Sequence, residues 1–352
     1  MPGIIEPGHF RFTASGETVV RLEQRLGYTH KGIEGLMTRR RSSATPQNLP
    51  AASPGDSTVA YALCASREPS KPRCSFDVPA RAVWLRALLA ELERLANHLG
   101  DIGAICNDAS FALMQAHCNV LREDVLRAAD IAFGHRLMRD VIVPGGVARD
   151  LDERGKRRIR AALDNIQRPL SRADRTLRQH RLASGSHRRH RHRLARAGKA
   201  VCRAGGYVGR ASGRAFDARR APGYAPYYDL RFDVPVLDEG DVNARVWIRI
   251  REVEQSLSLA QPDSGPSARR RAAACRSPSE PGPREGMALV EGFRGDIMVW
   301  LRLDGGRIER CHLRDPSWFQ WPLLEAAIED NIVADFPLCN KSFNCSYSGQ
   351  DL

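Results

Sequence analysis

The chain has 352 residues, of which 42% are apolar, so it can bury a sizeable core as one large domain or two medium ones. Its formal charge of +13 would favour nucleic acid or an anionic surface as a partner, but Arg175 to Phe216 alone holds twelve Lys and Arg and no Asp or Glu, so the rest is nearly neutral. No run of about 18 uncharged apolar residues occurs, and Met1 to Phe10 has no signal-peptide pattern, so we expect a cytosolic protein or one attached to a membrane through partners.

The first predicted elements are a β hairpin and a helix within residues 8–36. The segment alternates apolar and polar residues on both sides of a turn at Ser15 and Gly16, which is typical of a hairpin. After it, residues 38–55 and 66–75 are rich in Arg, Ser and Pro and lack apolar periodicity.

Two long helices follow. Leucines at helical spacing predict an amphipathic helix from Pro79 to Leu99, with Gly100 as its stop. A second apolar face predicts a helix from about Ser110 to Phe133. The short link between them implies an antiparallel helical pair in a helix-rich core.

The remaining predicted elements are shorter. A helical run covers 154–167, and a turn at 239–241 precedes another helix. A hairpin is expected over 296–313, around Asp304, Gly305 and Gly306, and a last helix over 321–330. The predicted fold class is mainly α with small β hairpins.

The nine cysteines are scattered and odd in number, which favours a reducing compartment over a disulfide framework. No CxxC pair occurs anywhere in the chain. Zinc fingers, thioredoxin-like motifs and ferredoxin-type clusters need such pairs, so the sequence disfavours all three.

Two motifs are better explained by plain structure than by ligand binding. "GGYVGRASGR" at 205–214 lacks GxGxxG spacing and a preceding apolar strand, so we interpret it as a Gly-rich turn that presents Arg210 and Arg214. "HRRHRHR" at 187–193 has arginines that would repel a metal ion and no aromatic residue for base stacking, which favours a solvated segment. Asp108 lies between the two long helices. Its residue type alone predicts no more than an N-cap for the helix that begins near Ser110.

Five blocks of the chain resemble one known family. They cover roughly half of the sequence and read "GYTHKGIEGL", "RAVWLRALLAELERLANHLGDIGAICNDASFALM", "GHRLMRDVIVPGGVARDL", "RASGRAFDARRAPGYAPYYDLRFDVPVLDEGD" followed by "RIREVEQSL", and "LRDPSWFQWPLLEAAIEDNIVADFPL". The chain resembles the large subunit of membrane-bound, formate-hydrogenlyase-type nickel-iron hydrogenases, which is homologous to the 49 kDa subunit of respiratory complex I.

The resemblance implies a helical-core subunit that packs against an iron-sulfur small subunit, beside a 30 kDa-like subunit and membrane subunits. It places the assembly on the cytoplasmic face of the inner membrane. In the hydrogenases two CxxC pairs hold nickel and iron, because thiolates suit a soft redox metal.

Both cysteine pairs are missing from this chain. Against the family's terminal pattern, Asp-Pro-Cys-x-x-Cys, Ser346 and Gly349 occupy the cysteine places and Cys345 falls on the proline place. The first pair should lie between Met37 and Val59, where the chain reads "ASPGDSTVAY". We therefore expect no nickel-iron centre and no metal ligands in this subunit.

The complex I side of the family implies a quinone site in the vacated cavity. There a carboxylate after the "NHL" helix is thought to relay protons, and Asp108 is the matching position. His9 lies nearest to the family's quinone-contacting histidine. Three further family-block residues are candidates for cofactor binding, with a structural or interfacial role as the alternative: Arg210, Asp217 and Arg219.

Three segments depart from the family, at about 38–76, 165–204 and 260–280. Each is rich in Arg, Ser and Pro or His and changes abruptly back to a match, as local reading-frame shifts would produce. The chain also starts within the first family block, so we expect a truncated amino end. The predicted division is 1–37 hairpin and helix start, 38–76 disrupted, 77–164 helical core, 165–204 basic and disrupted, 205–259 family block, 260–286 linker, and 287–352 hairpin, helix and tail.

The sequence thus predicts an oxidoreductase subunit that passes electrons from a partner's iron-sulfur cluster to quinone, without nickel. Nicotinamide oxidation, if present, belongs to another subunit. Two alternatives stay open: a basic nucleic-acid-binding protein built on residues 175–216, which the charge distribution disfavours, and a decayed, non-functional copy.

Overall fold

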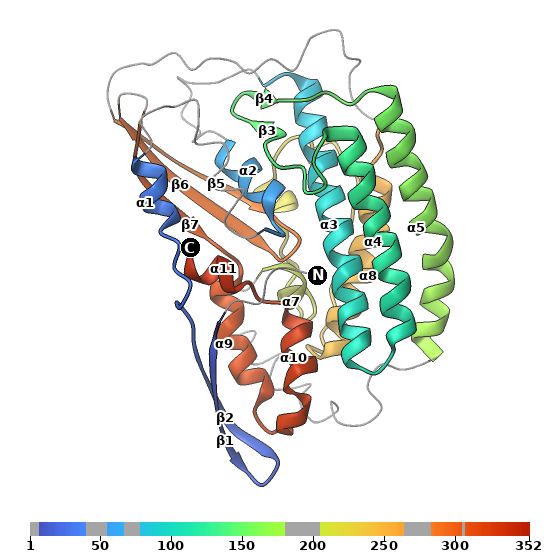
Figure 1. The fold of residues 1–352 in the computed structure, drawn as a ribbon, viewed down its shortest axis with the longest axis vertical. Coiled ribbons are helices and arrows are strands. Elements are labelled where there is room, and N and C mark those ends of the chain that lie inside the picture. The colour runs from blue at the N-terminus through green and yellow to red at the C-terminus, as the bar shows by residue number, and fades with distance from the viewer. Residues whose placement is uncertain (1–6, 40–54, 67–77, 180–204, 264–282, 305–306) are drawn as a thin grey trace.

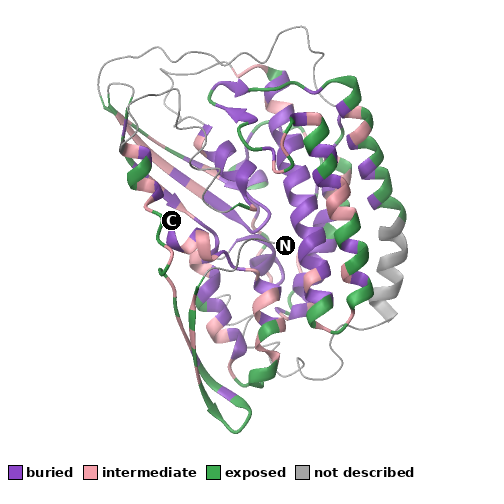
Figure 2. Cartoon of the chain, in the orientation of Figure 1, coloured by how far each residue is buried: buried purple, intermediate pink, exposed green. Residues whose placement is uncertain are grey.

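Four long helices form a bundle in the computed structural model (Figure 1), which describes residues 7–39, 55–66, 78–179, 205–263, 283–304 and 307–352. The leucines of the first predicted helix lie in α3, which packs between α4 and α8 and is buried on nearly every side (Figure 2). The bundle consists of α3 (Ala80–Asp108), α4 (Ala112–Phe133), α5 (Glu153–Gln179) and α8 (Val242–Leu259).

The predicted stop of the first helix at Gly100 is wrong, because α3 continues to Asp108. A Cβ at Gly100 would lie 2.9 Å from Cδ of Arg122, and one at Gly103 would lie 2.9 Å from Cβ of Cys118. Both glycines therefore allow α4 to approach α3 closely, and neither ends the helix. Asp108 is the last residue of α3 and is not the N-cap of the next helix.

A three-stranded antiparallel sheet lies beside the bundle, in the order β5, β6, β7. The predicted hairpin over 296–313 is confirmed by β6 and β7, although its turn at 305–306 lies outside the described residues. Helix α1 packs on β7, and α2 packs on β5 and β6. These elements are β5 (Arg284–Glu291), β6 (Asp296–Asp304), β7 (Arg307–Arg314), α1 (Ile33–Arg39) and α2 (Thr58–Ser66), with the short pair β3 (Ile142–Val143) and β4 (Gly146–Val147) near α2.

The carboxyl-terminal helices and the amino-terminal hairpin meet at the lower end of Figure 1. The predicted hairpin is confirmed by β1 (His9–Ser15) and β2 (Thr18–Arg25), and β2 packs on α9. The predicted last helix begins earlier than expected, at Ser317. These helices are α9 (Ser317–Ile328), α10 (Phe336–Phe343) and α11 (Tyr347–Asp351), joined by η4 (Val333–Asp335).

Two of the segments predicted to be disrupted contain regular structure. All but one residue of α2, within 38–76, are buried, and α5 continues through residue 179. Residues 40–54, 67–77, 180–204 and 264–282 lie outside the described residues, as does most of the basic stretch 175–216. The content of helices and small sheets confirms the predicted fold class.

Candidate functional site

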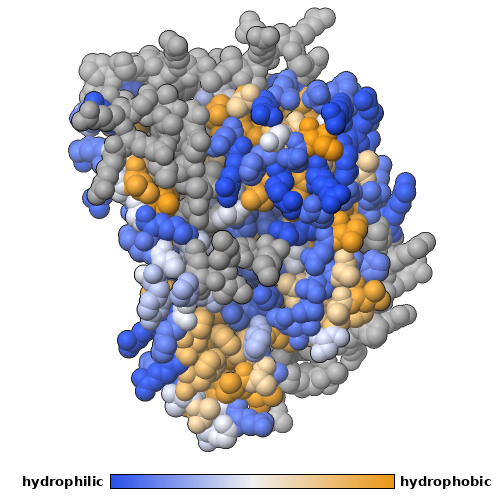
Figure 3. Space-filling model, in the orientation of Figure 1, coloured by the Kyte–Doolittle hydropathy of each residue, from blue (hydrophilic) through white to orange (hydrophobic). Residues whose placement is uncertain are grey.

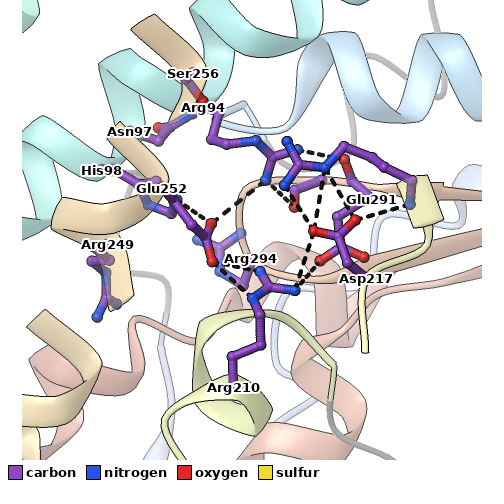
Figure 4. A network of polar contacts seen from close by, with 12 residues as sticks. Arg94, Asn97, His98, Arg210, Asp217, Arg249, Glu252, Ser256, Glu291 and Arg294 are labelled. Atoms are coloured by element: carbon purple, nitrogen blue, oxygen red, sulfur yellow. Dashed lines mark hydrogen bonds and ion pairs between the residues drawn. The ribbon is translucent and has the colours of Figure 1, made fainter. Parts of the chain in front are cut away.

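The three family-block candidates come together in a buried network of charged side chains, of which Figure 4 labels Arg210 and Asp217. Arg210 ends α7 (Gly206–Arg210), Asp217 follows it, and Arg219 begins η3 (Arg219–Gly223). Nη2 of Arg219 lies 2.7 Å from Oδ2 of Asp217, and Nη1 of Arg210 lies 3.7 Å from the same oxygen. The prediction that the Gly-rich turn presents Arg210 is wrong, because its side chain is fully buried.

Three glutamates from other elements complete the contacts of these arginines. Glu252 of α8 accepts from Nε of Arg210 at 2.8 Å, and Glu291 at the end of β5 accepts from Nη1 of Arg210 at 2.8 Å. Glu91 of α3 accepts from Nη1 of Arg219 at 3.0 Å. We define the buried network as these residues with two further members of α3: Glu91, Arg94, His98, Arg210, Asp217, Arg219, Glu252 and Glu291.

Burial and ion pairing act in opposite directions inside the buried network. Burial opposes ionisation of Asp217, but the charge of Arg219 outweighs it and lowers the pKa to about 2. Burial raises the pKa of Glu291 to about 7, and the neighbouring charge of Asp217 adds to the rise. The network joins α3, α7, α8 and β5 through these ion pairs.

A second cluster forms where the two cysteine-lacking segments meet. Tyr61 of α2 donates its hydroxyl hydrogen to Oδ2 of Asp315 at 2.7 Å, and the Asp315 carboxylate fills the space that a Cβ at Gly349 would occupy. Burial, followed by the charge of Asp315, raises the pKa of Tyr61 well above its ordinary value. We call this group the tail cluster: Asp56, Tyr61, Arg294, Asp315, Asn344, Ser346 and Gly349.

Arg294, in the turn between β5 and β6, bridges the two segments of the tail cluster. Its Nη2 lies 2.7 Å from Oδ2 of Asp56, and its Nε donates to the carbonyl oxygen of Asn344 at 2.6 Å. The amide of Asn344 in turn donates to Asp101 of α3 at 2.8 Å. The buried guanidinium group of Arg294 is therefore hydrogen-bonded on both sides. It links the first cysteine-lacking segment to the tail, and Asn344 links the tail to α3.

The tail cluster does not fit a nickel-iron centre. Ser346 caps α11 by accepting from the backbone nitrogen of Gly349. A Cβ at Gly349 would lie 2.4 Å from Cγ of Asp315, so a cysteine could stand there only if Asp315 moved. Among the described residues, no group of three or more His, Cys, Asp or Glu is arranged to hold a metal ion.

A pocket of about 280 Å³ opens next to the tail cluster, between the end of β2, α9 and α11. Two indole rings line it, from Trp318 and Trp321, together with Gln24 and Gln350. The indole nitrogen of Trp321 and both polar atoms of the Gln24 side chain are buried without a hydrogen-bond partner. Such groups are costly to leave unpaired.

The predicted catalytic residues lie on separate elements, the amino-terminal hairpin and the end of α3. His9 is exposed at the start of β1, opposite Arg25, and the preceding Gly8 packs on Tyr347. Asp108 is exposed at the end of α3, two helical turns below Asp101, or about 10 Å along the axis. The structure brings neither side chain into the buried network, and their roles stay predictions.

Apolar side chains gather at the lower end of the surface seen in Figure 3. The tip of the β1–β2 hairpin pairs with the loop after α9 through Thr18 and Ile332. Val20, Ile332 and Val333 are exposed there, and Val20 keeps 54% of its surface accessible. Among the described residues, no helix is long and apolar enough to cross a membrane.

Comparison with known proteins agrees with the resemblance seen in the sequence. The family model described as "Respiratory-chain NADH dehydrogenase, 49 Kd subunit" matches residues 109–262. An NADH-quinone oxidoreductase subunit of Desulfotalea psychrophila is 30% identical over 342 residues, which cover 92% of this chain and 87% of that protein. The chain belongs to the complex I 49 kDa and nickel-iron hydrogenase large subunit family.

Two other proteins are similar to this chain along nearly its whole length. The "Carbon monoxide-induced hydrogenase" of Rhodospirillum rubrum is 28% identical over 353 residues, covering 96% of this chain and 93% of that protein. One chain in the structure of a membrane-bound sulfane sulfur reductase, described as an archaeal respiratory membrane complex, shares the fold with a TM-score of 0.80 at 24% identity, over 97% of this chain and 94% of that one.

Proposed function

We propose that this family member works without nickel in a membrane-associated oxidoreductase complex and helps pass electrons from a partner's iron-sulfur cluster to quinone. One observation carries the proposal: the two segments that lack the family's cysteines meet in a cluster of protonatable and hydrogen-bonding groups. The Tyr61–Asp315 pair and the Arg294–Asp56 pair offer proton transfer and charge stabilisation there.

The pocket beside the tail cluster supports a planar carbonyl compound as the ligand. When bound, quinone supplies an acceptor of two electrons and two protons. The indole ring of Trp318 offers a flat wall, and a rotation of the Gln24 or Trp321 side chain would expose an N–H group that can donate to a carbonyl oxygen. His9, near the outer edge of this region, would orient or protonate the ligand.

Asp108 would exchange protons between solvent and the interior. It is exposed and lies on the helix that also carries Asp101, which contacts the tail through Asn344. A carboxylate at this place can take protons from bulk water and return them as the charge in the site changes.

The partners follow from the family and from the exposed apolar surface around Val20, Ile332 and Val333. We propose that an iron-sulfur small subunit, a 30 kDa-like subunit and membrane subunits join the chain on the cytoplasmic face of the inner membrane. Apolar surface of this kind favours protein contacts, because its removal from water is stabilising. The relatives, a hydrogenase and a member of an NADH-quinone oxidoreductase, agree with such an assembly.

The purified complex tests the proposal by metal analysis and quinone reduction. We expect no stoichiometric nickel, and reduction of a water-soluble quinone by a low-potential donor. Asp108→Asn should lower kcat by about 10²-fold or more if Asp108 relays protons. The matched control is Asp130→Asn, which changes another exposed carboxylate of the same bundle.

Stoichiometric nickel, or no quinone reduction in an intact complex, would overturn the proposed function. An Asp108→Asn variant as active as wild type would remove only the relay role of Asp108. Equal losses in both variants would indicate a general effect of surface charge instead.

A further inference from the structure

The buried network contains an unequal number of opposite charges. It has four carboxyl groups, from Glu91, Asp217, Glu252 and Glu291. It has three guanidinium groups, from Arg94, Arg210 and Arg219. None of these side chains is more than 2% exposed. An unbalanced charge away from water is costly, so the contacting groups favour one additional proton.

Arginines next to the network do not supply the missing charge, because each contacts a carboxylate of its own. Arg249 lies 3.1 Å from Asp101, and Arg294 lies 2.7 Å from Asp56. On the sheet side, Arg314 pairs with Asp296. The excess of one carboxylate therefore remains after the neighbours are included.

His98 is poorly placed to carry the additional proton. Its Nε2 already meets Glu252 at 2.8 Å, and its Nδ1 is buried without a partner, between the rings of Tyr207 and Phe293. A second N–H on this ring would have no acceptor. Burial lowers the pKa of His98, and its hydrogen bond to Glu252 only partly opposes this.

Glu291 and Asp217 are better placed, because they face one another across the same arginine. Nη1 of Arg210 lies 2.8 Å from Oε1 of Glu291 and 3.7 Å from Oδ2 of Asp217 (Figure 4). The other Glu291 oxygen accepts from the backbone nitrogen of Ala218, the residue after Asp217. Two adjacent buried carboxylates cannot both ionise cheaply, and they titrate as a pair.

Other charged and titratable groups near Glu291 come from the elements packed around it. Arg94 of α3 donates to its backbone carbonyl oxygen, the hydroxyl of Tyr224 lies by its backbone nitrogen, and Asp296 of β6 adds negative charge. The carboxylate of Asp296 disfavours ionisation of Glu291, in the same direction as Asp217.

We propose that Glu291 and Asp217 share one exchangeable proton and that this proton is a store for the tail cluster. The turn between β5 and β6 connects the buried network to the tail cluster. Backbone hydrogen bonds between Gly292 and Gly295 close this turn. Glu291 enters the buried network at one end of this turn, and Arg294 enters the tail cluster three residues later. The use of the store rests on the proposed function, whereas the presence of the proton does not.

The shared proton is tested by infrared titration of the full chain, which follows the C=O band of protonated carboxyl groups against pH. In wild type we expect a step with a midpoint near pH 7. Glu291→Gln should remove this step. Asp217→Asn should move it to lower pH, because three carboxylates then balance three guanidinium groups.

The matched control is Glu93→Gln, in the same helix as Arg94. Glu93 is buried outside the network, its carboxylate accepts from the backbone nitrogens of Val59 and Ala60, and burial raises its pKa to about 8. This variant should remove a different step and leave the one near pH 7. Any of three results would overturn the proposal. The wild type would show no step near pH 7, the step would survive Glu291→Gln, or Asp217→Asn would leave its midpoint unchanged. If Glu291→Gln fails to fold, the other two variants still decide, because the step near pH 7 must move in Asp217→Asn and persist in Glu93→Gln.

The role as a store is tested separately, in the assembled complex. The pH profile of quinone reduction should change near pH 7 in Glu291→Gln and not in Glu93→Gln. An unchanged profile would overturn the store while leaving the shared proton. A complex with no quinone activity at all would contradict the proposed function, and the infrared titration would stand apart from that result.

Discussion

The carboxylate of Asp315 depends on the hydroxyl of Tyr61 for one of its hydrogen bonds. Both side chains are fully buried, and the bond to Oδ2 is 2.7 Å long. The backbone nitrogen of Ser317 donates to the other oxygen, Oδ1, at 2.8 Å. Removing the Tyr61 hydroxyl would leave a buried carboxylate with less compensation, so a single oxygen atom matters for both stability and proton transfer at the tail cluster.

Tyr61→Phe should lower the free energy of unfolding by about 1–3 kcal/mol, as expected when a buried acceptor loses its partner. Urea denaturation measures the change. Tyr28→Phe is the matched control, because that side chain is exposed and should leave the unfolding free energy within about 0.5 kcal/mol of wild type. Equal stability of Tyr61→Phe and wild type would show that the bond contributes nothing.

At the scale of elements, the contact between α3 and α4 depends on the absence of side chains. Gly103 lies against Cβ of Cys118 and the backbone of Gln115. The interior of a protein is packed too densely to absorb an added methyl group without movement. The distance between the two helices is thus set by glycine.

Gly103→Ala should destabilise the protein by about 1–3 kcal/mol, because its Cβ would lie 2.9 Å from that of Cys118. Gly35→Ala, in α1, has nothing within 4 Å of the added Cβ and should stabilise by up to about 1 kcal/mol. Thermal unfolding of both variants measures the difference. The packing explanation fails if the two substitutions shift the melting temperature in the same direction.

The same glycines show what sequence patterns could and could not predict for the elements. Repeated leucines were enough to place α3, because apolar periodicity is a local signal. The continuation through Gly100 depends on α4, which only the folded chain brings close. Likewise, α2 was missed because the residues on both sides of it in the sequence are rich in Arg, Ser and Pro. The side chains of α2 are buried by packing against β5 and β6, which are distant in the sequence.

For the whole molecule, the pKa shifts of the buried network predict a stability maximum in mildly acidic solution. The pKa of Asp217 is lowered to about 2, so its contribution is present above its ordinary pKa near 4 and is lost as the pH falls toward 2. The pKa of Glu291 is raised to about 7, so its contribution is present below about pH 4 and is lost as the pH rises through 7.

Unfolding free energy measured by urea denaturation from pH 2 to 8 should therefore be highest near pH 4, where the contribution of Asp217 is complete and that of Glu291 is not yet lost. Each group can contribute a slope of up to about 1.4 kcal/mol per pH unit. Glu291→Gln should reduce the decline between about pH 4 and 7, and Asp217→Asn should reduce the decline below pH 4. A profile that rises steadily through pH 7 would contradict the assignment of Glu291, and one that is flat below pH 4 would contradict that of Asp217.

The candidate site was only partly predictable at this scale. Arg210, Asp217 and Arg219 could be selected from a family block, but nothing in the sequence paired them with Glu252, in the following block, or with Glu291, which lies outside the blocks. Tyr61 and Asp315 are 254 positions apart, and no local pattern connects them. Charge balance and burial belong to the assembled core and have no signature in a short stretch of chain.

The same long separations determine when the tail cluster can form during folding. Asp101 meets Asn344 across 243 positions, and Gly27 meets Asp351 across 324. Pairing such distant segments carries a loop-closure cost before any contact compensates for it, and chains dominated by such contacts fold slowly. Helices α3 and α4, which are neighbours in sequence, can associate first. We therefore expect a helical intermediate in which the bundle is present and the tail cluster is still open.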